Sequence, residues 1–119
     1  MHSILAALAA TVFAFGAAPP AAAQPGVTEQ RRVLGAGALT CGDWVRDAGT
    51  SSEVRLSWVL GYLTRANVYR ADGDLLAHVD ANGVRVWIDG YCRTHPLDTL
   101  STATLALEKA LTARQTRAK

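Results

Sequence analysis

The sequence lacks the residue patterns from which most enzyme and cofactor sites are recognised. It holds only two cysteines and three histidines, and the C-x-x-C-H pattern that attaches a c-type haem is absent. No serine, cysteine or other nucleophile stands in a local motif of the kind that hydrolases use. We therefore predict a non-enzymatic protein with no catalytic residue, no metal site and no cofactor.

Charged residues are also missing from the first 23 positions, which contain no Lys, Arg, Asp or Glu. Residues 3–18 form an Ala- and Leu-rich apolar run, and three alanines at 21–23 fit the small-residue pattern of a signal-peptidase site. The run is shorter than the roughly 20 residues that a membrane span needs. We predict an export signal over residues 1–23 and no stable membrane insertion after its cleavage. An uncleaved anchor or an ordinary N-terminal helix remains an alternative.

The two cysteines, Cys41 and Cys92, are expected to pair in an exported chain. Closing a loop of this length contributes roughly 4 kcal/mol in the chain-entropy model. A small domain has a total stability on the order of 5–10 kcal/mol. The sequence therefore predicts a domain that depends on its disulfide.

A zinc site is the main alternative use of these cysteines, with His95 as a third ligand. Tetrahedral zinc needs four protein ligands, or three and a water. The other histidine of the mature chain, His78, lies in an expected loop, and an oxidising compartment favours the disulfide. We therefore predict that no zinc is bound.

Acidic residues cluster in the segment that contains Asp72, Asp74, Asp80 and Asn82, which raises the question of calcium. Their spacing does not match an EF-hand loop, and no bidentate glutamate follows at the required distance. Asp72-Gly73 is an ordinary turn signal, and Asp80 or Asn82 is suited to cap the next helix. We interpret this segment as a connection.

Two further groups resemble sites but have simpler interpretations. Asp89 and Asp98 could act as paired catalytic carboxylates, but we expect Asp89 on a solvated helix face and Asp98 at the start of the last helix. Five aromatic residues could line a ligand pocket, although aromatic side chains at helical spacing usually form the core of a small domain. These five are Trp44, Trp58, Tyr62, Trp87 and Tyr91.

The net charge of +2 comes from the end of the chain. Lys109, Arg114, Arg117 and Lys119 follow the last acid, Glu108. Cations are favourable beside the negative end of a helix dipole, so this basic end does not by itself indicate a nucleic-acid partner. We predict none.

Capping and periodicity predict four helices. Thr40 and Asp43 form a capping box before a short helix that Gly49 ends. A second helix begins at the T-S-S-E of residues 50–53, with Thr50 as the preferred cap, and runs to about Ala71. Its apolar face is broad enough for the centre of a bundle.

Two residues of the second helix call for separate interpretation. Gly61 costs about 1 kcal/mol of helix propensity against alanine, so we expect another helix to approach it closely. Asn67 lies beside the apolar stripe and needs hydrogen-bond partners. A neighbouring loop is the expected partner, and a bound ligand is the alternative.

The third and fourth helices are predicted from residues 83–93 and from Pro96 to about Arg114. Val84, Trp87, Ile88 and Tyr91 fall on one face of the third helix. Pro96 ends it and suits the first turn of the last helix, along which apolar residues recur from Leu97 to Leu111. The predicted core residues are Trp44, Trp58, Leu60, Leu63, Val84, Trp87, Ile88, Tyr91, Leu100 and Leu107.

The predicted organisation is therefore a signal peptide, a flexible lead-in at 24–38, a helical domain at 39–114 and a basic tail at 115–119. The fold class is all-α, a small four-helix domain closed by one disulfide.

Three segments of the chain resemble the HdeA/HdeB family of small periplasmic acid-stress proteins: T-C-G-D-W at 40–44, W-V-L-G-Y-L-T-R-A-N at 58–67 and W-I-D-G-Y-C-R-T-H-P-L-D-T-L at 87–100. The shared features are an early Cys-x-x-aromatic, matched by Cys41 and Trp44, and a late Tyr-Cys with a proline after it, matched by Cys92 and Pro96. Immunity proteins of type VI secretion have a similar frame. The resemblance implies a periplasmic, all-helical, disulfide-closed protein.

The function that this resemblance implies is acid-stress holdase activity, in which protonation loosens the protein's packing or dimer and exposes surface for unfolded clients. Protonating the ten acids would take the formal charge from +2 to at least 2 + 10 = +12, and self-repulsion would favour loosening. The alternative is an immunity or inhibitor module that binds one specific partner. A homodimer is compatible with both.

Overall fold

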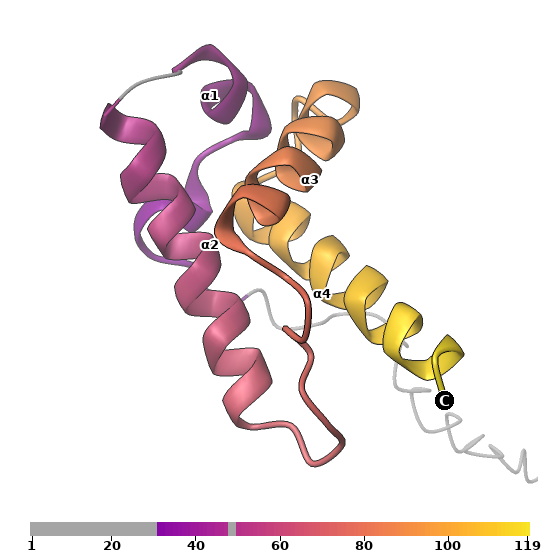
Figure 1. Cartoon of the computed structure of the whole chain (residues 1–119). Coiled ribbons are helices and arrows are strands. Elements are labelled where there is room, and N and C mark those ends of the chain that lie inside the picture. Colours follow the sequence, from indigo (N-terminus) through magenta and orange to yellow (C-terminus); the bar gives the residue numbers. More distant parts are fainter. Residues whose placement is uncertain (1–30, 48–49) are drawn as a thin grey trace, which may run out of the picture. The chain divides into compact units, whose positions relative to one another are not determined.

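The computed structural model describes residues 31–47 and 50–119, and these residues fold into helices joined by short connections (Figure 1). Within them no strand forms, and one isolated bridge pairs Thr40 with Thr99. This confirms the predicted all-α class and its four α-helices. The predicted signal peptide at 1–23 and the first part of the lead-in lie outside the described residues. The elements are η1 (Gly35–Ala38), α1 (Cys41–Arg46), α2 (Thr50–Val68), α3 (Ala81–Thr94) and α4 (Leu100–Arg117).

The lead-in is structured at its end. Gly35–Ala38 form a single 3-10 turn in which Gly37 is buried. The indole of Trp58 lies against this turn and donates a hydrogen bond from Nε1 to the carbonyl of Leu34 at 3.0 Å. The glycine backbone lets the ring approach closely, so residues 35–38 of the predicted lead-in form a turn that packs against α2.

Helix α1 begins as predicted. The Thr40 hydroxyl accepts from the backbone N–H of Asp43 at 3.1 Å, and the Asp43 carboxylate accepts from the backbone N–H of Thr40 at 3.0 Å. These reciprocal bonds satisfy donors at the helix start that would otherwise have no partner. The capping box is confirmed.

Helix α2 ends at Val68, three residues before the predicted end. The side chains of Thr50 and Ser51, on which the predicted cap depends, lie outside the described residues. The prediction that a helix packs on Gly61 is wrong for this chain, because nothing lies within 4 Å of a Cβ built there. Asn67 has the expected loop partners: its amide donates to Asp74 at 2.8 Å and its carbonyl accepts from the N–H of Leu75 at 2.6 Å.

Helix α3 starts two residues earlier than predicted, at Ala81, because Asp80 is its N-cap and accepts from the N–H of Gly83 at 2.6 Å. Its buried side chains, Val84, Ile88 and Cys92, lie on the predicted face. The period of 3.6 residues is therefore the correct interpretation of this stretch.

Three predictions about the start of α4 are wrong: that Pro96 lies in its first turn, that Leu97 begins its apolar side and that Asp98 lies at its start. The N-cap is Thr99, whose hydroxyl accepts from the N–H of Thr102 at 3.2 Å. Pro96 and Asp98 therefore lie in the turn before the helix, and the Leu97 side chain is 90% exposed. A proline suits a tight turn as well as a helix start, so the sequence alone did not separate the two. The helix also extends beyond residue 114, to Arg117.

The core lies between α2, α3 and α4, with α1 packed over its end. The four predicted core residues that are only half-buried pack against the core from its edge, and three of them are aromatic. Trp and Tyr keep such edge positions because their N–H and O–H groups need hydrogen-bond partners. Of the predicted set, Trp44, Leu63, Val84, Ile88, Leu100 and Leu107 are buried, and Trp58, Leu60, Trp87 and Tyr91 are half-buried.

Two glycines give opposite predictions. A Cβ at Gly37 would lie 2.1 Å from Cζ2 of Trp58, so Gly37→Ala should lower the free energy of unfolding by about 1–3 kcal/mol. Gly61→Ala meets open space and should raise it by up to about 1 kcal/mol through helix propensity. Urea unfolding followed by circular dichroism at pH 7 measures both. Equal effects of the two substitutions would contradict the packing described here.

Candidate functional site

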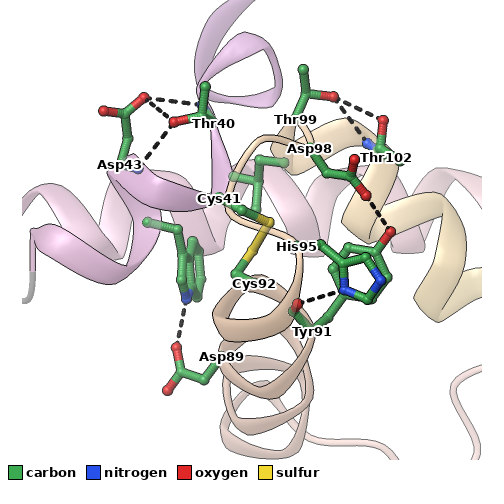
Figure 2. Close-up of a disulfide and its surroundings, with 12 residues drawn as sticks. Thr40, Cys41, Asp43, Asp89, Tyr91, Cys92, His95, Asp98, Thr99 and Thr102 are labelled. Carbon is green, nitrogen blue, oxygen red and sulfur yellow. Dashed lines mark hydrogen bonds between the residues drawn. A yellow bond between two sulfur atoms is a disulfide. The ribbon is translucent and has the colours of Figure 1, made fainter.

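The disulfide between Cys41 and Cys92 joins the first turn of α1 to the last turn of α3 (Figure 2). Both cysteines are fully buried, and their Cα atoms are 4.7 Å apart. The disulfide is confirmed, and it leaves no thiolate for a metal. Within residues 31–47 and 50–119, no group of three or more His, Cys, Asp or Glu side chains is arranged to hold a metal ion.

Backbone hydrogen bonds close the same junction. The N–H of Cys41 donates to the carbonyl of Asp98 at 2.7 Å, and that of Gly42 donates to the carbonyl of Pro96 at 3.0 Å. The N–H of Leu100 returns a bond to the carbonyl of Leu39 at 2.8 Å. The starts of α1 and α4 thus satisfy each other's unpaired backbone groups. We call these three bonds and the disulfide the disulfide junction.

Two carboxylates lie beside the disulfide junction (Figure 2). Asp89 of α3 accepts from the indole Nε1 of Trp44 at 2.5 Å, which corrects its predicted place on a solvated face. Asp98 accepts from the Tyr91 hydroxyl at 2.6 Å, so it is not the expected cap of α4. This bond, followed by burial, raises the pKa of Tyr91 above its ordinary value. The phenol is therefore a stable donor at neutral pH.

The imidazole of His95 stacks on Tyr91, with ring centroids 4.2 Å apart. Its Nδ1 lies 2.9 Å from the carbonyl of Tyr91 and 2.8 Å from the hydroxyl of Thr94. Among the described residues, the Thr94 hydroxyl is the one nucleophile within hydrogen-bond distance of the ring, and it donates to the carbonyl of Tyr91 at 3.0 Å. His95 therefore closes the end of α3, as Figure 2 shows.

An ion pair attaches α2 to the end of α1. The guanidinium of Arg55 is 10% exposed, and it donates to the Asp47 carboxylate at 2.6 Å and to the carbonyl of Asp43 at 2.9 Å. A charge with so little access to water depends on its partner. Asp47 itself is 45% exposed.

Two more carboxylates connect α2 to its other neighbours. Glu108 of α4 accepts from the Tyr62 hydroxyl at 2.9 Å, and Glu53 of α2 pairs with Arg85 of α3 at 2.6 Å. Burial, and then the bond to Glu108, raises the pKa of Tyr62 above its ordinary value. Each of the three helix contacts of α2 thus includes one charged carboxylate.

Every acidic side chain in the described part of the chain has a partner. Of the ten acids, Glu29 lies outside it, which leaves 10 − 1 = 9. Five of the nine connect separate elements and form the set that we call the helix-tying carboxylates. The other four act locally in the capping box of α1, in the loop after α2 and at the cap of α3. The helix-tying carboxylates are Asp47, Glu53, Asp89, Asp98 and Glu108.

The helix-tying carboxylates each accept from a donor or cation on another part of the described chain. Protonating a carboxylate removes its charge and leaves the partner cation or donor less well satisfied. Separating α2 from α3 and α4 would uncover side chains that are now fully or nearly fully buried, such as Val59, Leu63 and Leu107. None of the helices in the described residues is both long and apolar enough to cross a bilayer.

Sequence reasoning missed the helix-tying role of these five acids. A contact between Tyr62 and Glu108 spans 46 residues, and no local pattern specifies such a pairing. One signal was available: Arg55 falls beside Leu56 and Val59 on the apolar side of α2, and an arginine there requires a buried acceptor.

These features define the class of protein: an all-helical, disulfide-closed domain whose helices are connected by carboxylate contacts. Comparisons with protein-family models, curated proteins and solved structures return no significant match. The resemblance to the HdeA/HdeB family therefore stays a prediction.

Removing the disulfide tests the disulfide junction. The cysteines are 51 residues apart, so Cys41→Ser with Cys92→Ser should lower the free energy of unfolding by about 4 kcal/mol. Urea unfolding of this double variant, of the oxidised protein and of the protein in dithiothreitol gives the difference. Coincident unfolding curves for all three would show that the backbone bonds alone hold the junction.

The capping box gives a prediction of pH dependence. Hydrogen bonds from the side chain and then the backbone of Thr40 lower the pKa of Asp43 below its ordinary 3.8, and Arg46 adds to this. The pKa of Asp43 is thus lower in the folded than in the unfolded protein. The ionised carboxylate therefore stabilises the fold fully above about pH 4, and this stabilisation is lost as the pH falls through the folded-state pKa. Asp43→Ala should therefore be less stable than the wild type at pH 7, and the difference should shrink as the pH falls below about 4. A difference in thermal unfolding that stays constant with pH would contradict this assignment.

Proposed function

We propose that this protein is an exported periplasmic binding protein that acts as an acid-stress holdase for unfolded clients. The single observation that carries this proposal is the position of the five helix-tying carboxylates, each of which bonds a donor or cation on a separate part of the fold. Acid acts on those connections directly, so the same protonation that unfolds clients would loosen this domain.

Helix α2 is the element that we expect acid to release. Its polar contacts to α1, α3 and α4 include the carboxylates Asp47, Glu53 and Glu108. Its N–H and C=O groups form no backbone hydrogen bond to those helices among the bonds within the described residues. The junction of α1, α3 and α4, by contrast, has the disulfide and three backbone bonds, none of which titrates in acid.

Repulsion between positive charges supplies the driving force for opening the domain in acid. Full protonation of the acids takes the formal charge from +2 to at least +12, and like charges repel in a small domain. The disulfide limits the resulting expansion because it keeps α1 attached to α3. The expected acid state is compact, with exposed apolar surface, as in acid-expanded states of other domains.

Light scattering of an unfolding client, with and without the protein, tests the function. At about pH 2.5, well below the ordinary pKa of carboxyl groups, the protein should suppress aggregation at near-stoichiometric ratios. At pH 7 it should have little effect, since the apolar faces are packed. Unchanged client aggregation at pH 2.5 would refute the proposal.

Amide variants distinguish the effect of losing a helix-tying contact from the effect of changing the net charge. Asp47→Asn and Glu108→Gln each mimic protonation of one contact, and each should raise the pH at which suppression of client aggregation begins. Asp72→Asn is the matched control, because it removes the same charge from a residue that pairs only with nearby Arg70. If all three variants shift the onset equally, net charge alone explains the response.

A second candidate is a module that binds one specific partner at neutral pH. It is favoured by apolar side chains that the folded domain leaves exposed, including Val54 and Val68 on α2, Tyr69 directly after it and Leu97 before α4. This function predicts capture of one stoichiometric partner from a periplasmic extract at pH 7. A holdase predicts no such capture at that pH.

A further inference from the structure

A groove runs along α4 on the side that faces the connection between α2 and α3. It consists of two adjoining cavities of about 190 and 470 Å³. The smaller is lined by Val79 and by Trp87 of α3, and the larger by Leu75 and Ala118. Ligand sites are typically concave and mostly apolar with a few placed polar groups. The walls of the larger cavity are mostly apolar, and those of the smaller are polar and apolar in similar measure.

The two cavities meet at His78, Leu111 and Arg114, which line both. Leu111 forms the floor, and the two polar side chains stand at the centre. The guanidinium of Arg114 has one long hydrogen bond, 3.4 Å to the carbonyl of Ala77, and no carboxylate partner in residues 31–47 and 50–119. A cation with no carboxylate partner in the described residues therefore lines both cavities.

His78 has an unusual backbone, with a φ of 63°, the left-handed conformation that glycine normally adopts. Its neighbours fix this geometry: the N–H of Val79 donates to the carbonyl of Leu76 at 2.9 Å, and that of Leu76 donates to Asp74 at 3.0 Å. A strained non-glycine residue beside a cavity is a recognised feature of binding sites. The conformation places an imidazole beside Arg114.

Two acids also border the groove, but their carboxylates already accept hydrogen bonds from other residues. Asp80 accepts from the N–H of Gly83 at the positive end of α3. Asp74 accepts from the amide of Asn67 at 2.8 Å and from the N–H of Leu76. The centre of the groove thus favours an anion.

We propose that this groove binds a medium-length alkyl carboxylate, of the fatty-acid type. The carboxylate lies between His78 and Arg114, and the alkyl chain follows α4 over Leu111 and Leu107 to the indole of Trp87. The seven residues from Arg114 back to Leu107 cover about 10 Å of helix. The alkyl chain of the ligand has to span this distance to reach Trp87. This site is independent of the acid response and is occupied at neutral pH.

Isothermal titration calorimetry at pH 7 with sodium decanoate, below its micelle concentration, tests the proposal. We expect saturable one-to-one binding. Butyrate should not bind, because its chain does not reach Trp87. Decanol and decylamine should bind roughly tenfold to a hundredfold more weakly, since decanol brings no negative charge to Arg114 and protonated decylamine accepts no hydrogen bond from it. If decylamine binds as well as decanoate, the acids at the rim dominate and the proposal is wrong.

Two variants assign the binding to the groove. Arg114→Gln should weaken decanoate binding about tenfold or more, while Arg117→Gln, on the same helix but lining neither cavity, should leave it unchanged. His78→Asn keeps a residue that tolerates the left-handed conformation and should also weaken binding. Far-UV circular dichroism verifies that each variant is folded. Equal affinities for Arg114→Gln and Arg117→Gln, or no binding of decanoate to the wild type, would overturn the assignment.

Discussion

The disulfide junction is the constraint around which the other helices are placed. Cys41 and Cys92 fix the start of α1 on the end of α3, and the turn before α4 completes the arrangement through the carbonyls of Pro96 and Asp98. Each of these helix ends has backbone groups without intrahelical partners, and the junction pairs several of them with one another. A helix of only six residues, α1, needs such support because short helices are marginal by themselves.

Helix α2 differs from the other three in how it is held. Its buried face packs into the core through Leu56, Val59 and Leu63, and its polar contacts to α1, α3 and α4 include three carboxylates. Apolar packing does not depend on pH, but the carboxylate contacts do. The domain therefore has one part secured by covalent and backbone bonds and one part secured by packing and charge. That division makes a partial, acid-dependent opening physically reasonable.

Local signals in the sequence predicted local structure well. The capping box of Thr40 and Asp43, the face of Val84 and Ile88 and the loop partners of Asn67 all depend on residues close together in the chain. The disulfide could be predicted because the chain holds only two cysteines. The errors arose where tertiary contacts decided the outcome. Gly61 was predicted to allow the close approach of another helix, and no described residue packs there. Asp98 was predicted at the start of α4, but it lies before the helix and accepts from Tyr91.

The candidate site was the least predictable part. The helix-tying carboxylates are ordinary surface acids in sequence, and only the fold shows that each reaches a donor on another element. The groove along α4 is likewise formed by residues from three segments. No sequence pattern predicted the left-handed conformation of His78.

Near-UV circular dichroism during an acid titration tests the central claim most directly, because Trp44, Tyr62 and Tyr91 each bond a helix-tying carboxylate. In the oxidised protein, the aromatic signal should fall cooperatively below about pH 4 while far-UV helix content is largely kept, and both should recover on neutralisation. In the reduced protein, the aromatic and helical signals should be lost together. An aromatic signal that stays unchanged down to about pH 2 would contradict the account.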